Sequence, residues 1–267
     1  MSHTNSHSIV SFPSSRLFTM DVGKIGMRKH HIKAMIELDV TESRMKLKQR
    51  RRESGEKLSF TAWILRCIAR AILEHKQIHA LRKGKSKLII FDDVDISILV
   101  EKKIAGVPVP LPMIIRNANK KSIVEITAEI ENAKAQQVSN ENDYVLERDR
   151  EKLPLKLFAL LPQFIRVWIW KLLLSNPMRI KKMMGTVVTT SIGMMGAVKG
   201  WFIPYSIHPV CFALGSIIKK PGVKKGNIEV REMLEMTILI DHDVIDGAPA
   251  ARFVARLAEL VEGGFDL

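Results

Sequence analysis

The sequence predicts an α/β fold in which a mixed β-sheet is flanked by helices. Apolar residues that alternate with polar ones indicate half-buried strands, and between them lie segments whose apolar residues recur every three to four positions, as in amphipathic helices. The 267 residues show no internal repeat and no low-complexity linker, and 46% of them are hydrophobic, which suffices for one sizeable core. We therefore expect residues 1–267 to form a single domain.

The same patterns place the individual elements. In residues 31–41 every second residue from Ile32 to Val40 is apolar, as in a half-buried strand. Ser59 is an N-capping residue, and Ser122 with Glu125 has the spacing of a capping box. Helices are expected at about 42–53, 60–75 and from 123 toward 137. Further strands are expected at about 87–90, 94–100, 107–113, 186–191, 210–215 and 228–240.

One histidine stands at the end of the last predicted strand, where the chain enters a helix. His242 continues the apolar face of Ile238 and Ile240, so we expect it to point toward a buried site. Asp246 precedes Gly247 and a run with helical spacing, which makes it a natural N-cap. From these residues alone, a core histidine and a capping aspartate are favoured over a catalytic pair.

The formal net charge of +14 raises the question of nucleic-acid binding. The densest basic run is residues 46–52, KLKQRRR, but no aromatic residue is interleaved with it and the chain has only two tyrosines. Platforms for stacking bases are therefore lacking, and a solvated helix face is the better interpretation. We expect no nucleic-acid partner, although a basic surface suits a small anionic partner.

The cysteines and the hydropathy pattern limit the class of protein further. Cys67 and Cys211 lie in separate apolar runs without nearby metal-ligand residues, so buried reduced thiols are expected and no metal site. No window of about twenty residues is free of charge, and residues 1–15 lack the layout of a signal peptide. We expect a soluble, cytoplasmic protein.

The segment His242-x-x-x-Asp246-Gly247 is similar to the catalytic signature of a known family, the acyltransferase cores of 2-oxo acid dehydrogenase complexes. This family of dihydrolipoamide acyltransferases is related to chloramphenicol acetyltransferase. Other parts of the chain resemble conserved family segments: residues 31–41, 94–100, 114–129, 185–193 and 213–215. The resemblance implies a chloramphenicol acetyltransferase-like two-layer fold. It also implies acyl transfer between coenzyme A and a thiol such as dihydrolipoamide, with coenzyme A as substrate and no tightly bound cofactor.

The resemblance assigns roles to the residues of the motifs. His242 would be the general base, and the hydroxyl of Thr190, where relatives usually have serine, would stabilise the oxyanion. Ser191 is the alternative donor. Asp246 would be a buried structural carboxylate that fixes the loop holding the histidine, rather than a proton-transfer group.

Three other positions near the motifs are less clear-cut. Gly247 would lie at the substrate, and Asn117 would line the substrate channel unless it serves only as a turn residue. Asp243 stands where relatives usually carry arginine, which weakens the substrate assignment more than the chemistry.

The resemblance also predicts the assembly. Relatives form trimers whose sites lie between subunits, so we expect a homotrimer or a larger cage of trimers. Residues 1–30 leave no room for a lipoyl domain, so we expect the acyl carrier to be a lipoyl protein on another chain or coenzyme A itself. Residues 15–20 are expected to replace the helix that relatives have before the first strand. Two other functions remain open, a catalytically weak oligomeric scaffold and O-acylation of a small molecule.

An atypical apolar insertion is expected at about residues 140–184. Within it, residues 153–174 contain four aromatic side chains but are interrupted by Lys156, Pro162, Arg166 and Lys171. These interruptions argue against a membrane-spanning helix and predict two short amphipathic helices joined at Pro162. Three roles remain open for the insertion: packing on the domain or a neighbouring subunit, a lid over a long acyl chain, and docking at a membrane surface.

Overall fold

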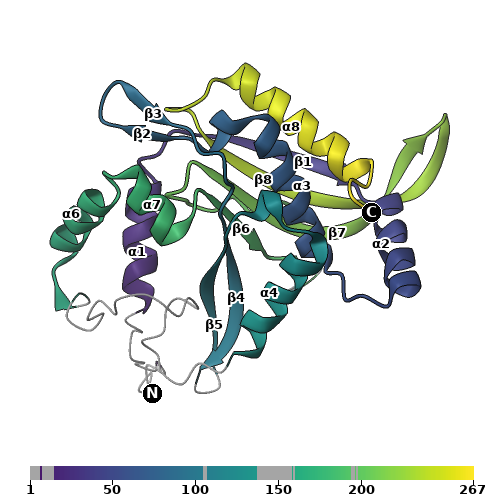
Figure 1. Cartoon of the computed structure of the whole chain (residues 1–267), viewed down its shortest axis with the longest axis horizontal. Helices are drawn as coiled ribbons and strands as arrows, with labels where there is room; N and C mark the ends of the chain where they lie inside the picture. Colours follow the sequence, from purple (N-terminus) through teal and green to yellow (C-terminus); the bar gives the residue numbers. More distant parts are fainter. Residues whose placement is uncertain are drawn as a thin grey trace, which may run out of the picture.

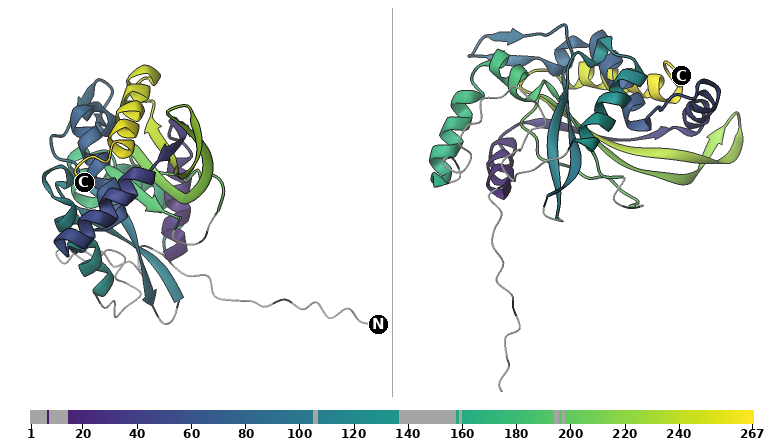
Figure 2. Two further views of the ribbon diagram at one scale, coloured as in Figure 1. Left: turned by 90° about the vertical axis from the view of Figure 1, so that its right-hand side faces the viewer. Right: turned by 60° about the horizontal axis from the view of Figure 1, so that its bottom comes forward.

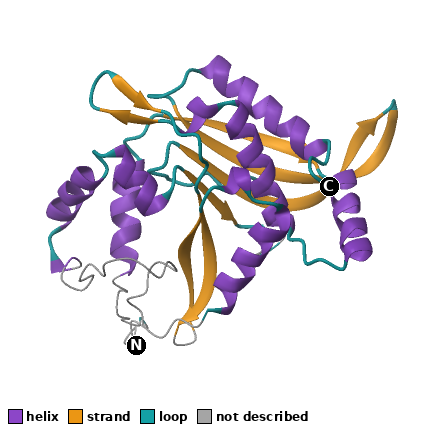
Figure 3. Cartoon of the chain, in the orientation of Figure 1, coloured by secondary structure: helices purple, strands orange, loops and turns teal. Residues whose placement is uncertain are grey.

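A six-stranded mixed sheet with helices packed on one of its faces forms the body of the protein (Figures 1 and 3). The computed structural model describes residues 7, 15–104, 107–136, 158, 160–193, 196 and 198–267. The strand order is β1-β8-β7-β6-β4-β5, with β6 parallel to both of its neighbours and the other pairs antiparallel. The predicted α/β class is confirmed.

The elements agree with most of the predicted boundaries. The helices are α1 (Ser15–Gly26), α2 (Thr41–Ser54), α3 (Phe60–Glu74), α4 (Ile123–Ala135), α6 (Gln163–Leu173), α7 (Pro177–Met184) and α8 (Gly247–Glu262), with short 3₁₀ turns at Lys76–His79 and Ala118–Lys120. The strands are β1 (His31–Asp39), β4 (Ile96–Ile104), β5 (Val107–Ile115), β6 (Val187–Ser191), β7 (Val210–Lys224) and β8 (Asn227–Asp241), plus a small hairpin of β2 (Leu81–Lys83) and β3 (Lys87–Ile89). Of these, α1, α7 and β2 are not predicted from the sequence.

The core lies between the sheet and the helices α3, α4 and α8. Trp63 of α3, Phe253 of α8 and Phe212 of β7 are fully buried in one hydrophobic cluster, in which the Phe212 and Phe253 rings lie 6.2 Å apart. Both predicted N-caps are present: the Ser59 hydroxyl accepts the N–H of Ala62, and Ser122 forms the full capping box with its partner at N3. The caps fix where α3 and α4 begin, and their apolar faces then complete the core.

Strand β8 agrees with the predicted strand 228–240, but β7 runs well beyond the predicted 210–215, so the hairpin of β7 and β8 extends beyond the sheet (Figure 2). Lys225 and Gly226, at its tip, both have positive φ, as a tight two-residue hairpin turn requires. The tip side chains Val223, Ile228 and Val230 are exposed.

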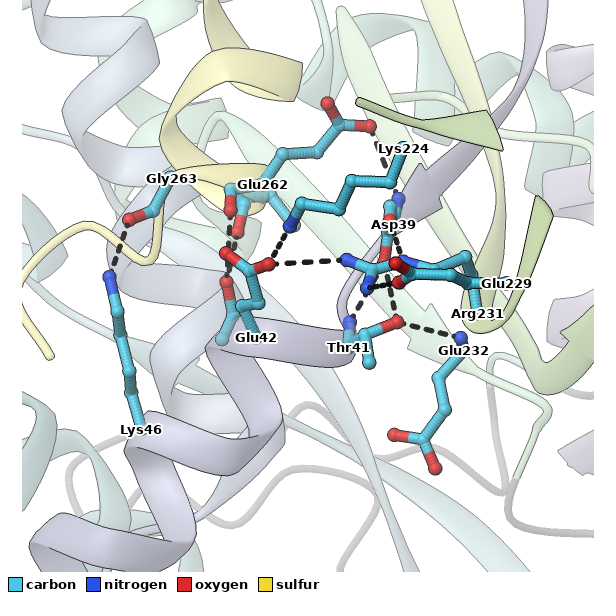
Figure 4. A network of polar contacts seen from close by, with 12 residues as sticks. Asp39, Thr41, Glu42, Lys46, Lys224, Glu229, Arg231, Glu232, Glu262 and Gly263 are labelled. Atoms are coloured by element: carbon cyan, nitrogen blue, oxygen red, sulfur yellow. Dashed lines mark hydrogen bonds and ion pairs between the residues drawn. The ribbon is translucent and has the colours of Figure 1, made fainter. Parts of the chain in front are cut away.

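Arg231 anchors the base of this hairpin to β1 and α2 (Figure 4). Its buried guanidinium donates to Asp39 Oδ2 at 2.6 Å and pairs with Glu42, which also pairs with Lys224. Burial alone would raise the pKa of Asp39, but hydrogen bonds from Thr41 and Arg231 outweigh it and hold that pKa below its usual range. The positive charge of Arg231 is therefore compensated by the carboxylates of Asp39 and Glu42.

A helix does precede the first strand, contrary to the expectation that residues 15–20 replace it. Helix α1 forms because Asp21 and Phe18 contact residues of the insertion, the first through an ion pair with Arg166 and the second by stacking on Phe158. Such long-range contacts cannot be read from the local pattern. Of the two helices predicted in residues 153–174, α6 begins directly after Pro162, while the other falls mainly on residues outside the described part of the chain.

Candidate active site

His242 lies on a tight turn between β8 and α8. Its side chain is 51% exposed, so the expectation of a buried position is wrong for the single chain. The N–H groups of Val244 and Ile245 both donate to the carbonyl of Asp241, which bends the chain and takes His242 out of the strand's alternation. The backbone N–H of His242 donates to His30 O at 2.9 Å. Backbone hydrogen bonds therefore fix the position of His242, while its imidazole ring remains exposed.

Asp241 is the carboxylate that fixes this turn. It is 2% exposed, its Oδ1 accepts the N–H of Asp243, and its Oδ2 pairs with Lys29 Nζ at 2.5 Å. Neither Asp241 nor Lys29 is predicted from the sequence to have a role at this turn. A charged residue that ends an otherwise apolar strand, on the face opposite His242, was the signal available for Asp241.

The expectation that Asp246 is buried and anchors the loop is wrong. Asp246 stands at the N-cap position of α8, but its side chain is 89% exposed and makes no capping hydrogen bond. Its Oδ1 lies 4.0 Å from His242 Nδ1, which is too long for a hydrogen bond. Gly247, the first residue of α8, is exposed, and open space surrounds the position that a Cβ would take.

Asp243 occupies the position where arginine was expected, and its neighbours explain how a carboxylate is accommodated. Its Oδ1 lies 3.0 Å from His30 Nδ1 and its Oδ2 lies 3.8 Å from Arg82 Nη1. The hydrogen bond between His30 and Asp243 raises the pKa of His30 and lowers that of Asp243. The negative charge of Asp243, beside His242, is thus compensated by His30 and Arg82.

The candidate oxyanion donors lie on β6, in the middle of the sheet. Thr190 and Ser191 are the last residues of that strand, and both are partly exposed. Gly193 follows them, and a Cβ there would lie 2.1 Å from the carbonyl oxygen of Gly215. Only glycine lets the chain pass β7 so closely after Thr190.

Thr190 and His242 of one chain are far apart. Thr190 pairs with Ala213 of β7, which pairs with Thr237 of β8, so Thr190 is level with a residue five positions before His242. At about 3.3 Å per residue along a strand and about 4.8 Å between strands, the two residues are separated by roughly 19 Å. One carbonyl group cannot contact both side chains of the same subunit.

Asn117 lies at a turn after β5. It adopts the left-handed conformation at φ 51°, its side chain is exposed, and its N–H donates to the buried Asp95. Arg116 Nη1 pairs with the same Asp95 at 3.1 Å and also donates to the carbonyl of Lys181 at the end of α7. Asn117 therefore serves as a turn residue, and no contact among the described residues links it to His242.

Two other histidines and both cysteines are buried. Burial lowers the pKa of His79 and of His208 to about 4, so both are neutral hydrogen-bonding groups near neutral pH. Burial raises the pKa of Cys67, and that of Cys211 to about 12, so neither thiol is a ready nucleophile. Among the described residues, His242 is thus the exposed histidine that stands within the predicted catalytic motif.

The sequence matches the family model described as 2-oxoacid dehydrogenases acyltransferase (catalytic domain) over residues 28–142 and 174–266. The lipoamide acyltransferase component of the branched-chain alpha-keto acid dehydrogenase complex of Bacillus subtilis is 26% identical over 94% of this chain and 54% of its own length. The dihydrolipoyllysine-residue acetyltransferase component of the pyruvate dehydrogenase complex of Staphylococcus epidermidis is 25% identical over 86% of this chain and 45% of its own. The chain spans about half the length of these curated relatives.

Solved structures share the fold. A probable dihydrolipoamide acetyltransferase from Listeria monocytogenes superposes with a TM-score of 0.68 at 20% identity, covering 97% of this chain and 96% of that one. An Azotobacter vinelandii dihydrolipoamide acetyltransferase, studied for the catalytic roles of a serine, a histidine and an asparagine, gives 0.67 at 20% identity, covering 98% and 95%. Chloramphenicol acetyltransferase gives 0.50 at 12% identity, covering 94% and 96%. The predicted chloramphenicol acetyltransferase-like architecture is confirmed.

Proposed function

Because the chain belongs to the family of 2-oxoacid dehydrogenase acyltransferase catalytic domains, we propose that it transfers an acyl group between coenzyme A and a thiol acceptor such as dihydrolipoamide. The observation that carries the proposal is the His242 turn, which lies within the matched residues 174–266 and presents an open imidazole. The turn is fixed by the buried Asp241 and not by the histidine ring. The ring therefore remains available to a substrate.

The proposed step is direct transfer between thiols. His242 takes the proton of the acceptor thiol as its sulfur attacks the thioester carbonyl, forming a new carbon–sulfur bond and a tetrahedral oxyanion. The oxyanion then collapses, the original carbon–sulfur bond breaks, and the imidazolium returns its proton to the leaving thiolate. The step needs a neutral histidine as base, because a thiol with a pKa near 8.5 is mostly protonated at neutral pH. It needs no covalent acyl-enzyme, because the acceptor sulfur attacks the thioester directly.

Thr190 is the proposed donor to the oxyanion, with Ser191 as the alternative. A single preorganised donor of this kind is worth on the order of 3 kcal/mol of transition-state stabilisation. Since Thr190 and His242 are roughly 19 Å apart in one chain by strand spacing, we propose that His242 of one subunit faces Thr190 of its neighbour in a cyclic trimer.

The related structures support these roles. In the Azotobacter enzyme, the histidine and the asparagine investigated for catalysis are four residues apart, and the third residue is a serine. This chain has His242 and Asp246 at the same spacing, and Thr190 supplies a hydroxyl. One neighbour is the cubic core of a pyruvate dehydrogenase multienzyme complex, with a TM-score of 0.68, which supports an assembly larger than a monomer.

The test is an acyl-transfer assay with a panel of acyl-coenzyme A donors. Free coenzyme A and acyl-coenzyme A would be separated by liquid chromatography, with dihydrolipoamide, a lipoylated carrier protein or a hydroxyl-bearing small molecule as the acceptor. We expect turnover with a thiol acceptor. Transfer only to a hydroxyl would indicate O-acylation, and no turnover by a folded oligomer with any acceptor would indicate a scaffold.

A further inference from the structure

Helix α6 exposes a line of large apolar side chains. Leu160, Phe164, Trp168 and Leu172 are spaced by four, so they share one side of the helix and of the turn before it. Their exposed fractions are 80%, 71%, 64% and 55%. We call these four residues the α6 stripe. A stripe of this size is unusual on a surface that faces only water.

Helix α6 is oriented so that Arg166 faces inward and the α6 stripe faces outward. Arg166, near its centre, is 5% exposed and forms a two-pronged ion pair with the fully buried Asp21 of α1 at 2.8 and 3.1 Å. Trp170 points to the same inner side, where its ring meets Phe158 edge-on. A buried ion pair of this geometry fixes how α6 lies on α1, so the outward position of the α6 stripe is set by the fold.

Basic side chains flank the stripe. A shallow groove is lined by Lys24 of α1, by Arg28 just after that helix and by Lys171 of α6, together with Phe164 and Trp168. All three cationic residues are exposed. In the described residues of α1 and of 160–184, Asp21 is the only acidic residue, and it is neutralised by Arg166. Among these described residues, the surface therefore combines apolar and cationic groups and presents no exposed carboxylate.

Both helices lie outside the part of the chain that matches the family. The match covers residues 28–142 and 174–266, whereas α1 is Ser15–Gly26 and α6 is Gln163–Leu173. They pack side by side at the end of the molecule opposite the β7–β8 hairpin (Figures 1 and 2). The surface is thus an addition to the shared catalytic architecture and needs a separate explanation.

We propose that the α6 stripe and its basic flank dock this protein on an anionic membrane surface. An in-plane helix of this kind buries aromatic and aliphatic side chains at the level of the headgroups, while lysine and arginine contact anionic lipids. No helix among the described residues is long and apolar enough to cross a bilayer. The same surface of a second copy fits less well than a membrane, because two such basic faces repel each other.

The experiment is vesicle flotation of the intact protein. Vesicles of phosphatidylcholine with about 30% phosphatidylserine should carry the protein upward, and pure phosphatidylcholine should carry much less. Phe164→Ser with Trp168→Ser should weaken binding at least about tenfold, because two large side chains no longer enter the lipid. Lys24→Gln with Lys171→Gln should weaken binding and reduce its dependence on salt.

Two matched variants serve as controls. Val223→Ser with Val230→Ser removes similarly exposed apolar side chains from the hairpin tip and should bind like the wild type. Lys48→Gln with Arg52→Gln removes two exposed charges from α2, where the densest basic run lies, and should bind nearly as well. Failure of the wild type to float, or losses as large in either control, would overturn the proposal.

Two further measurements separate the alternatives. Vesicles with brominated acyl chains should quench tryptophan fluorescence, and Trp168→Phe should remove most of this quenching while binding persists. If the Phe164/Trp168 double variant instead changes the oligomeric mass, or selectively slows long acyl donors in solution, the stripe is a subunit contact or an acyl lid and the proposal fails. Transfer of short acyl groups in solution should be unchanged, so this test is independent of the proposed activity.

Discussion

Lys29 and Asp241 form an ion pair, with Nζ 2.5 Å from Oδ2, directly beneath the turn that carries His242. Asp241 also accepts the N–H of Asp243 and its backbone carbonyl accepts two further N–H groups of the turn. The position of the candidate catalytic histidine thus depends on a residue one position before it. The structural role expected for Asp246 belongs to Asp241.

Asp241→Asn should therefore lower both stability and rate. The amide can still accept the N–H of Asp243 but loses the charge that pairs with Lys29, at a cost of about 1–2 kcal/mol because Lys29 is partly exposed. We expect a lower melting temperature and a lower kcat with little change in KM. An unchanged kcat in a less stable variant would show that the turn geometry does not depend on this carboxylate.

His242→Ala and Asp246→Ala should behave differently. Loss of a general base should reduce kcat roughly 10²- to 10⁴-fold, while the half-exposed ring contributes little to stability. Asp246→Ala should change the free energy of unfolding by less than about 0.5 kcal/mol, because its exposed carboxylate makes no capping bond. Urea unfolding and steady-state kinetics of both variants check this, and a large loss of stability on removing Asp246 would contradict the structure.

Complementation tests whether the site is shared between subunits. His242→Ala and Thr190→Ala should each be nearly inactive alone. Refolded together in equal amounts, they should restore an intact pair at roughly a quarter of the interfaces of a cyclic trimer. Activity of the mixture and its mass in solution are the measurements. No recovery from verified mixed trimers would place both residues in one subunit's site or remove Thr190 from it.

Acid should destabilise the fold through His79 and His208. Their pKa values are held at about 4, below the ordinary value near 6.5, so the unfolded chain binds more protons between these pH values. Stability is then complete above about pH 6.5 and falls as the pH drops toward 4, by up to about 3 kcal/mol for each histidine. Urea unfolding at pH 7 and 4.5 measures this. His79→Gln should flatten the dependence, and an unchanged slope would contradict the assignment.

Arg231→Ala should be one of the more destabilising changes outside the core. It leaves Asp39 without its 2.6 Å partner at the base of the hairpin (Figure 4). Because Asp39 is partly exposed, we expect about 2 kcal/mol. Arg256→Ala on α8 is the control, since its side chain is more exposed and its loss should lower the melting temperature less than that of Arg231. Equal effects in thermal denaturation would show that burial of Arg231 adds nothing.

The sequence by itself determined most of the elements and the family. Alternation from Ile32 to Val40, the caps Ser59 and Ser122, and the motif at His242 depend on local backbone chemistry and spacing, which a one-dimensional pattern records. It also identified residues 153–174 as too interrupted to span a membrane, and Pro162 as the point where α6 begins.

Only the tertiary structure decided which groups are buried and how they pair. Asp241 is held by Lys29, more than two hundred residues away, and Asp21 by Arg166 of the insertion, so the partners that bury these carboxylates and leave Asp246 exposed are set by long-range packing. The roughly 19 Å between Thr190 and His242 likewise follows from strand order and register. Burial, charge compensation and distance depend on long-range packing, which is why they emerge only when the chain is folded.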